Sequence, residues 1–223
     1  MAEHHVFADG DPATTRPIVW SYYVALRGSD ATLIDVGFRD RQVARTWGVE
    51  LLDVAAEVRD LLAGRVVRDV FLTHEHFDHI DNLDEVLATY PAARVTLSAA
   101  AHRRIAAEGA PPVRAALATA QVREVSASAC FDDWRVETVA GHTEGSSVVF
   151  CAHEGRRYVL AGDECYLREN VTSRRAVGVH ASIDRNADFL RRVAANGDTV
   201  LPCHDPAVFE EYEAVTANVV RIF

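Results

Sequence analysis

The sequence lacks the features that mark membrane, secreted and fibrous proteins. No apolar run in its 223 residues approaches the ~18 residues that a membrane-spanning helix needs. Its first residues have neither a basic region nor an apolar core, so we expect no secretory signal. Repeats, low-complexity runs and long Pro/Gly/Ser-rich linkers are also missing. We therefore expect one globular domain over residues 1–223, a length that a single hydrophobic core commonly supports.

Cysteine is scarce and is not spaced for a zinc knuckle. The four cysteines, Cys130, Cys151, Cys165 and Cys203, include no Cys-x-x-Cys pair. Without a secretory signal, the simplest interpretation is free thiols in a reducing, cytoplasmic location. The sequence assigns no chemical role to Cys165 or Cys203, which we expect to pack as small apolar groups.

Positive charge is in deficit. The sequence has 23 basic and 33 acidic side chains, which gives a net charge of -10 and a pI near 5.4. An acidic chain is a poor partner for nucleic acid or for an anionic membrane. The arginine pairs are scattered along the chain rather than gathered into one stripe. We expect neither nucleic acid nor a membrane as a partner.

What the sequence does contain is an alternation of strand-length apolar runs and amphipathic helical stretches. Strands are expected at 18–26, 32–36, 66–72, 94–97, 121–125, 134–139, 146–151, 157–160 and 199–201. Helices are expected at 51–62, 83–90, 98–109, 182–196 and 207–219. This alternation in both halves predicts an α/β protein built from layers of sheet and helix. Polar clusters follow several of the strands, where the sites of layered folds gather.

Histidine is abundant, and one segment concentrates it. Of the ten histidines, three stand with an aspartate in His74-x-His76-x-Asp78-His79. Residues two apart in a strand share a face, so His74 and His76 can reach one cation together. Asp78 and His79 follow at the turn and can face a second cation. Neutral imidazole and carboxylate are ligands for divalent metals, so this segment predicts a metal site.

Three further strand ends carry a residue of the same kind. His142 lies in a glycine-bounded turn, Gly-His-Thr-Glu-Gly-Ser. Asp163 follows the apolar run at 159–161, and His204 follows Leu201-Pro202. Each is a weak signal alone, but the ordered set is a strong one.

These motifs resemble those of the metallo-β-lactamase superfamily, over residues 18–204. The resemblance implies an αββα sandwich, with two mixed β-sheets flanked by helices and the metals at one edge. It implies one metal on His74, His76 and His142, a second on Asp78, His79 and His204, and Asp163 bridging both. Asp35, in Leu-Ile-Asp-Val-Gly, would support the metal ligands from behind.

A finer resemblance is to the N-acyl-homoserine lactonase branch. Asp163-x-x-Tyr166 followed by Glu-Asn, and Phe77 inside His-Phe-Asp-His, fit that branch. It implies that Tyr166 and Phe77 contact the substrate. The chain departs from the branch in two places. The histidine motif is followed by Ile80-Asp81-Asn82, and segment 99–130 is shorter than in the branch. Both differences bear on acyl-chain recognition.

The implied chemistry is the opening of a lactone ring by a metal-bound hydroxide. Two divalent cations, zinc first and otherwise manganese, cobalt or iron, would lower the pKa of a water from 15.7 toward ~7. Tyr166 would donate to the developing oxyanion, and Asp78 would carry the proton to the leaving alkoxide. The substrate would be a small lactone or ester, and a homodimer partner is left open.

Alternative functions for the same residues remain open. The nearest is a glyoxalase II-like thioester hydrolase or another carboxyl-ester hydrolase of this fold. Three other functions are less well matched. A phosphodiesterase would call for a basic cluster near the ligands, which this acidic chain lacks. An iron-dependent redox enzyme and a binder without activity fit less well with a complete ligand set. Among the remaining histidines, we expect His102 and His153 on the surface, His4 and His5 in a frayed terminus, and His180 in a loop that could border the pocket.

Overall fold

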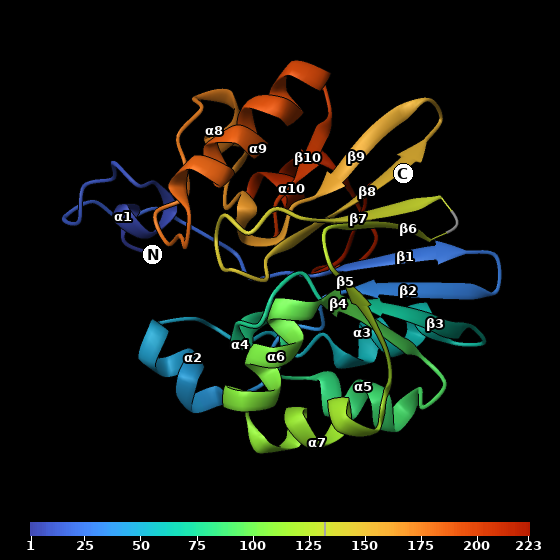
Figure 1. The fold of residues 1–223 in the computed structure, drawn as a ribbon. Helices are drawn as coiled ribbons and strands as arrows, with labels where there is room; N and C mark the ends of the chain where they lie inside the picture. The colour runs from blue at the N-terminus through green and yellow to red at the C-terminus, as the bar shows by residue number, and fades with distance from the viewer. Residues whose placement is uncertain (132) are drawn as a thin grey trace.

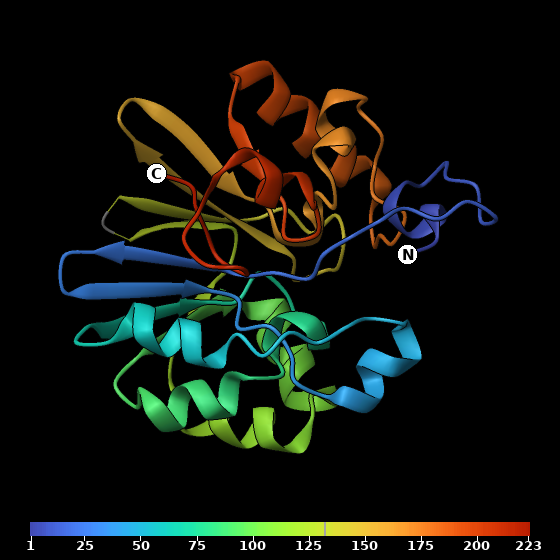
Figure 2. The same cartoon turned by 180° about the vertical axis from the view of Figure 1, so that it is seen from behind.

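The computed structural model describes residues 1–131 and 133–223 and contains two five-stranded sheets that face each other. Helices cover the outer faces of the sheets (Figure 1). Figure 2 shows the same layers from behind, with the two sheets between the helices. Both sheets mix parallel and antiparallel pairs, so the structure confirms the αββα sandwich.

The first sheet is built from the first half of the chain, in the order β1-β2-β3-β4-β5. β1 and β2 pair antiparallel, and the other neighbours pair parallel. Its strands are β1 (Tyr23–Arg27), β2 (Asp30–Ile34), β3 (Val66–Phe71), β4 (Arg94–Ser98) and β5 (Gln121–Val125). The helices of this half are α2 (Arg41–Trp47), α3 (Ala55–Leu62), α4 (Phe77–Ile80), α5 (Leu83–Thr89), α6 (Ala99–Glu108) and α7 (Pro111–Thr119).

The second sheet has the order β10-β9-β8-β7-β6, with only β9 and β10 parallel. Its strands are β6 (Ser128–Phe131), β7 (Trp134–Thr138), β8 (Ser147–His153), β9 (Arg156–Leu160) and β10 (Thr199–Leu201). Its helices are η1 (Gly162–Glu164), α8 (Arg168–Thr172), α9 (Ile183–Asn196) and α10 (Ala207–Glu211). A short helix α1 (Glu3–Val6) begins the chain, and β11 (Glu213–Ala214) and β12 (Val220–Arg221) form a small antiparallel pair near its end.

Alternation along the strands distributes apolar side chains between the two faces of each sheet. Leu33 and Val70 pack among the helices, whereas Ile34 and Phe71, the next residues on β2 and β3, pack between the sheets. Leu160 joins them there from β9. Among the described residues, no helix is long and apolar enough to cross a bilayer.

Two expected elements begin several residues later in the structure. The expected strand 18–26 pairs with β2 only from Tyr23 onward. Before that, the N–H groups of Val19 and Ser21 donate to the carbonyl oxygens of His204 and Cys203, so this stretch follows a loop of the other half. The expected helix 51–62 begins only at Ala55.

The predicted helix 207–219 is wrong beyond Glu211. After α10 the chain reverses, with the N–H of Val215 donating to the carbonyl of Val219. The Thr216 hydroxyl accepts from the N–H of Asn218, and both side chains donate to Glu57 of α3. Such local side-chain bonds compete with helix formation, and the apolar periodicity did not reveal them.

The N-terminal segment is part of the core and is not a frayed terminus. Val6 and Phe7 are completely buried against Tyr166, Leu167 and Val177. The His5 carbonyl accepts from the N–H groups at 178 and 179, so the segment is also fastened through its backbone. The contacts with Tyr166 connect this segment directly to a predicted site residue.

We predict that Phe7→Ala lowers the free energy of unfolding by about 3–5 kcal/mol, because it leaves a cavity where a fully buried ring was. Urea unfolding of the protein measures this change. Phe223→Ala, which removes a half-exposed ring, is the matched control and should cost at most about 1 kcal/mol. Equal losses for the two variants would show that the N-terminal segment does not stabilise the core.

Candidate metal centre

The histidine-rich segment lies in the loop that joins β3 to α4. The sequence predicts that His74 and His76 lie on a strand. This prediction is wrong, because β3 ends at Phe71. His76 immediately precedes α4, and Asp78 and His79 lie on that helix. The loop and the first helical turn, rather than strand alternation, bring the side chains together, with the His74 ring centroid 4.6 Å from His76 and 4.1 Å from His79.

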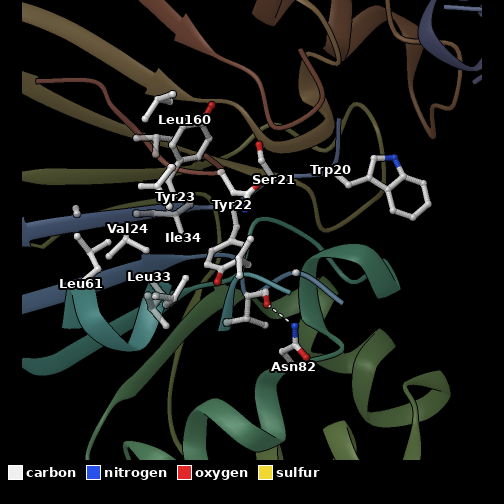
Figure 3. Close-up of a pocket in the computed structure, with 18 of the residues that line it drawn as sticks. Trp20, Ser21, Tyr22, Tyr23, Val24, Leu33, Ile34, Leu61, Asn82 and Leu160 are labelled. Carbon is white, nitrogen blue, oxygen red and sulfur yellow. Dashed lines mark hydrogen bonds between the residues drawn. The ribbon is translucent and has the colours of Figure 1, made fainter. Parts of the chain in front are cut away.

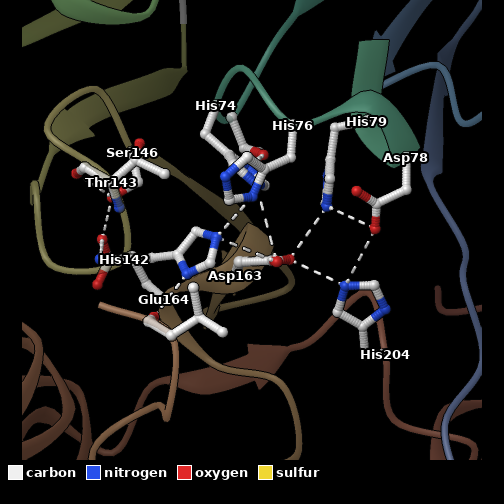
Figure 4. A network of polar contacts seen from close by, with 12 residues as sticks. His74, His76, Asp78, His79, His142, Thr143, Ser146, Asp163, Glu164 and His204 are labelled. Atoms are coloured by element: carbon white, nitrogen blue, oxygen red, sulfur yellow. Dashed lines mark hydrogen bonds and ion pairs between the residues drawn. The ribbon is translucent and has the colours of Figure 1, made fainter. Parts of the chain in front are cut away.

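All seven predicted ligand residues converge, in two groups. In each group the candidate ligand atoms lie within 4.8 Å of one another. The first group is His74, His76, His142 and Asp163, and a second consists of Asp78, His79 and His204. Figure 4 shows both groups around Asp163, with residues from both halves of the chain.

Asp163 lies between the groups and turns one oxygen toward each. Its Oδ2 is 3.4 Å from His142 Nε2 and 3.7 Å from His74 Nε2. Its Oδ1 is 3.1 Å from His79 Nε2 and 3.0 Å from His204 Nε2. A carboxylate placed in this way can be shared by two cations.

The far nitrogens of the rings are held by the protein. His79 Nδ1 donates to Asp35 Oδ2 at 2.8 Å, and Asp35 also accepts from the backbone N–H and hydroxyl of Thr73. His142 Nδ1 and His204 Nδ1 donate to the carbonyls of Val179 and Val19, each at 2.8 Å. These bonds place the proton on Nδ1 and leave the Nε2 lone pair toward the centre.

Two buried nitrogens at the centre have no hydrogen-bond partner among the described residues. They are His74 Nε2 and His79 Nε2, whose approaches to Asp163, at 3.7 and 3.1 Å, do not have hydrogen-bond geometry. A buried polar atom without a partner costs free energy, and coordination of a cation removes that cost. The orphaned atoms and the donor set, imidazole with carboxylate, both fit divalent metal ions.

Burial and neighbouring charges shift the pKa values at the centre in opposite directions. Burial, with His79 nearby, lowers the pKa of His74 well below its ordinary value and favours the neutral imidazole that binds metals. Burial alone would also lower the pKa of His79, but Asp78, Asp163 and Asp35 raise it well above its ordinary value. Burial would raise the pKa of Asp163, but the surrounding histidines, His204 first, hold it well below the usual range.

Tyr166 stands beside the centre, as the resemblance implied. Its ring stacks on His204 at 5.0 Å and meets His142 edge-on at 5.9 Å. Burial, followed by the Asp163 carboxylate, raises the pKa of Tyr166 well above its ordinary value. The phenol therefore keeps its proton at neutral pH and remains a hydrogen-bond donor.

Phe77 belongs to an aromatic cluster that the sequence did not reveal. We call Trp20, Phe38, Trp47 and Phe77 the aromatic cluster. The Phe77 ring lies 5.7 Å from Trp20, 5.5 Å from Phe38 and 6.4 Å from Trp47. Trp20 also meets His204 edge-on at 6.3 Å, so the cluster borders the second ligand group. Its members are far apart in sequence, and no periodicity relates them.

A cavity of about 1800 Å³ extends from Asp78, Trp20, Phe38 and Trp47 into the space between β1 and α3. Figure 3 shows Tyr22, Leu33 and Leu61 along it, and Asn82 donating to the Val36 carbonyl at its side. The cavity gives Asp78 an approach lined by both aromatic and charged side chains, among them Trp20, Phe38 and Arg39.

The remaining histidines and cysteines lie outside the two groups. His102 pairs with Glu124, His153 is exposed, and His180 Nδ1 donates to the Val177 carbonyl. Cys165 is buried and donates to the Leu167 carbonyl. Cys203 is buried beside Asp35 and His79. The sequence showed only that it precedes the predicted ligand His204.

The sequence also belongs to a known superfamily. A family model of the metallo-beta-lactamase superfamily matches residues 14–204. The chain is therefore a member of that superfamily, a class of hydrolases, and it carries a His/Asp metal-binding cluster. No curated protein sequence matches it significantly.

Solved structures of similar fold include several lactonases. One is an N-acyl homoserine lactone hydrolase with the product N-hexanoyl-L-homoserine at its catalytic metal centre, 12% identical with a TM-score of 0.77 over 96% of this chain and 92% of that one. AiiA of B. thuringiensis with N-decanoyl-L-homoserine is 11% identical, with a TM-score of 0.77 over 96% and 92%. AidC, a dizinc quorum-quenching lactonase, is 15% identical, with a TM-score of 0.62 over 85% and 73%. At these identities the likeness shows the fold.

We predict that Asp35→Asn weakens binding of a divalent cation by about 10- to 100-fold, because one amide oxygen cannot replace the two carboxylate oxygens that accept from Thr73 and His79. Competition with a chromophoric chelator measures the affinity. Asp69→Asn, which disturbs the partly buried pair with Arg94 on the neighbouring strand, is the control. Unchanged affinity in Asp35→Asn would show that this bond does not support the ligand.

Proposed function

We propose that this protein is a two-metal hydrolase that opens the lactone ring of acyl-homoserine-lactone-like substrates. The observation that carries the proposal is the position of Asp163, with one oxygen toward each histidine group. That geometry supports the ligand assignment implied by the sequence, with His74, His76 and His142 on one cation and Asp78, His79 and His204 on the other. Divalent ions bound there would supply Lewis acidity and an activated water. Zinc is the first candidate, because the donors are its usual ligands and a dizinc lactonase shares the fold.

The side chains around the centre have separate tasks in this proposal. Tyr166 donates its phenolic proton toward the carbonyl oxygen as negative charge develops there. Asp78, which lines the cavity, lies 3.5 Å from His79 Nε2 and 3.7 Å from His204 Nε2. That place lets its carboxylate take a proton from the attacking water and pass it to the ring oxygen as the acyl–oxygen bond breaks. The product is a hydroxy acid, which releases one proton to solution at neutral pH.

The lactone is favoured as the substrate class by the surroundings of the centre. Trp20, Phe38 and Trp47, with Phe77 packed against them, give an apolar wall where the substituent of a small ester would lie. Solved structures of the same fold carry N-hexanoyl- or N-decanoyl-L-homoserine.

The four cysteines are free thiols, which fits the cytoplasmic location expected from the sequence.

We predict that zinc-loaded protein opens N-hexanoyl-homoserine lactone and that Asp163→Ala abolishes this activity, because neither ligand group is complete without the shared carboxylate. Proton release in a pH-stat measures ring opening directly. Simple γ-lactones, S-acyl glutathione, a phosphodiester and a β-lactam complete the substrate panel. Cleavage of the thioester with inert lactones would replace the proposal by the glyoxalase II-like alternative.

We predict that Tyr166→Phe lowers kcat by about 10²- to 10³-fold with little change in KM, because the lost donor acts mainly on the transition state. Phenylalanine keeps the ring that stacks on His204, so metal content should stay the same. Tyr158→Phe, in the core between the sheets, is the matched control. A Tyr166→Phe enzyme with wild-type kcat would remove the phenol from the mechanism.

A further inference from the structure

The metal-binding loop around His142 rests on a buried carboxylate, Glu164, that neither the motifs nor the proposed mechanism uses. We infer that Glu164 is a positioning residue: with Asn186 it fixes the 140–146 loop and thereby sets how tightly the group of His74, His76 and His142 binds a divalent cation. The inference rests on the proposed two-metal function, but it concerns metal binding rather than the choice of substrate.

One oxygen of Glu164 holds the loop by three donors. Glu164 is completely buried, and its Oε1 accepts from the N–H groups of Gly141 at 2.8 Å and His142 at 2.9 Å. The hydroxyl of Ser146, at the other end of the loop, donates to the same oxygen. Figure 4 shows Glu164 beneath this loop, beside Asp163. The carboxylate thus restrains the backbone of the ligand itself and both ends of its turn.

The second oxygen ties the loop to α9. Glu164 Oε2 accepts from Asn186 Nδ2 at 2.8 Å, and Asn186 Oδ1 accepts from the N–H of Val177 at 3.0 Å. Two residues further on, the Val179 carbonyl accepts from His142 Nδ1. His142 is therefore held twice, at its backbone by Glu164 and at its ring by Val179, and Asn186 joins the two supports. The result is a closed ring of hydrogen bonds.

Close packing explains why the loop needs glycine at 141. A Cβ there would lie 2.4 Å from Glu164 Oε2 and 2.8 Å from Asn186 Cβ. The loop backbone approaches the carboxylate too closely for any side chain. The glycine before His142 is therefore needed because Glu164 of η1 packs against it, and not only because of the turn.

The type of side chain at 164 decides which hydrogen bonds can form. A carboxylate accepts at both oxygens, which suits four donors on two sides. Within residues 1–131 and 133–223, no arginine or histidine side chain forms an ion pair with Glu164, so only neutral donors surround it. A glutamine would satisfy the loop with its oxygen but would set its NH₂ against the NH₂ of Asn186. The neutral analogue therefore breaks the ring of hydrogen bonds at one identified place.

The test is a titration of metal-free protein with Co²⁺, followed by its visible absorption and by competition with a chelator. His142→Ala identifies which of the two bound equivalents depends on the first group. We expect Glu164→Gln to weaken that same equivalent by about 10- to 100-fold and to change its absorption band, while the other equivalent stays within about 3-fold. Glu137→Gln is the matched control and should change neither; it disturbs a carboxylate of β7 that pairs with Arg135 of the same strand and with Arg192 of α9.

A milder variant covers the case in which Glu164→Gln does not fold. Ser146→Ala removes one donor and leaves the carboxylate with its other partners, so the same equivalent should weaken by about 2- to 10-fold. Unchanged Co²⁺ binding and spectra in the folded variants would overturn the inference, as would equal weakening of both equivalents. Wild-type protein that binds two Co²⁺ ions but opens no lactone would refute the proposed function and leave this inference standing.

Discussion

The structure depends on one buried carboxylate that both halves of the sandwich must reach. Asp163 follows β9 of the second sheet, whereas His74 comes from the loop after β3 of the first sheet and His79 from α4, which follows that loop. Neither half can build the two ligand groups alone. The two sheets therefore have to pack so that the ends of their strands lie close together at this edge. The apolar core between the sheets, which includes Phe71 and Leu160, provides that alignment.

A cluster of buried imidazoles and carboxylates is costly unless each polar atom has a partner. The protein meets this need on the outer side of the rings, with Asp35 behind His79 and the carbonyls of Val19 and Val179 behind His204 and His142. These supports come from segments remote in sequence. The inward nitrogens are left for cations, so the same network that makes burial tolerable also orients the ligands.

The residues of the candidate site could be predicted well because metal ligation restricts residue type and spacing so strongly. Histidine and aspartate in a fixed order, each after an apolar run, seldom occur together for reasons of packing alone. Less regular features were not predictable. The aromatic cluster joins Trp20, Phe38 and Trp47 only in space, and the reversal near Thr216 depends on side-chain bonds to α3. Nothing along the sequence distinguishes Glu164 from other acidic residues, because its donors come from the 140–146 loop and from α9.

The sequence by itself determined the alternation of strands and helices, the seven candidate ligands and, by resemblance, the superfamily. These properties follow from local periodicity and from the narrow chemistry of metal donors. Only the tertiary structure decided that His74 and His76 lie on a loop, that Asp163 divides its oxygens between two groups, and that Glu164 holds the turn of His142. Distances between remote segments depend on how the two sheets pack, and no pattern along the chain encodes them directly.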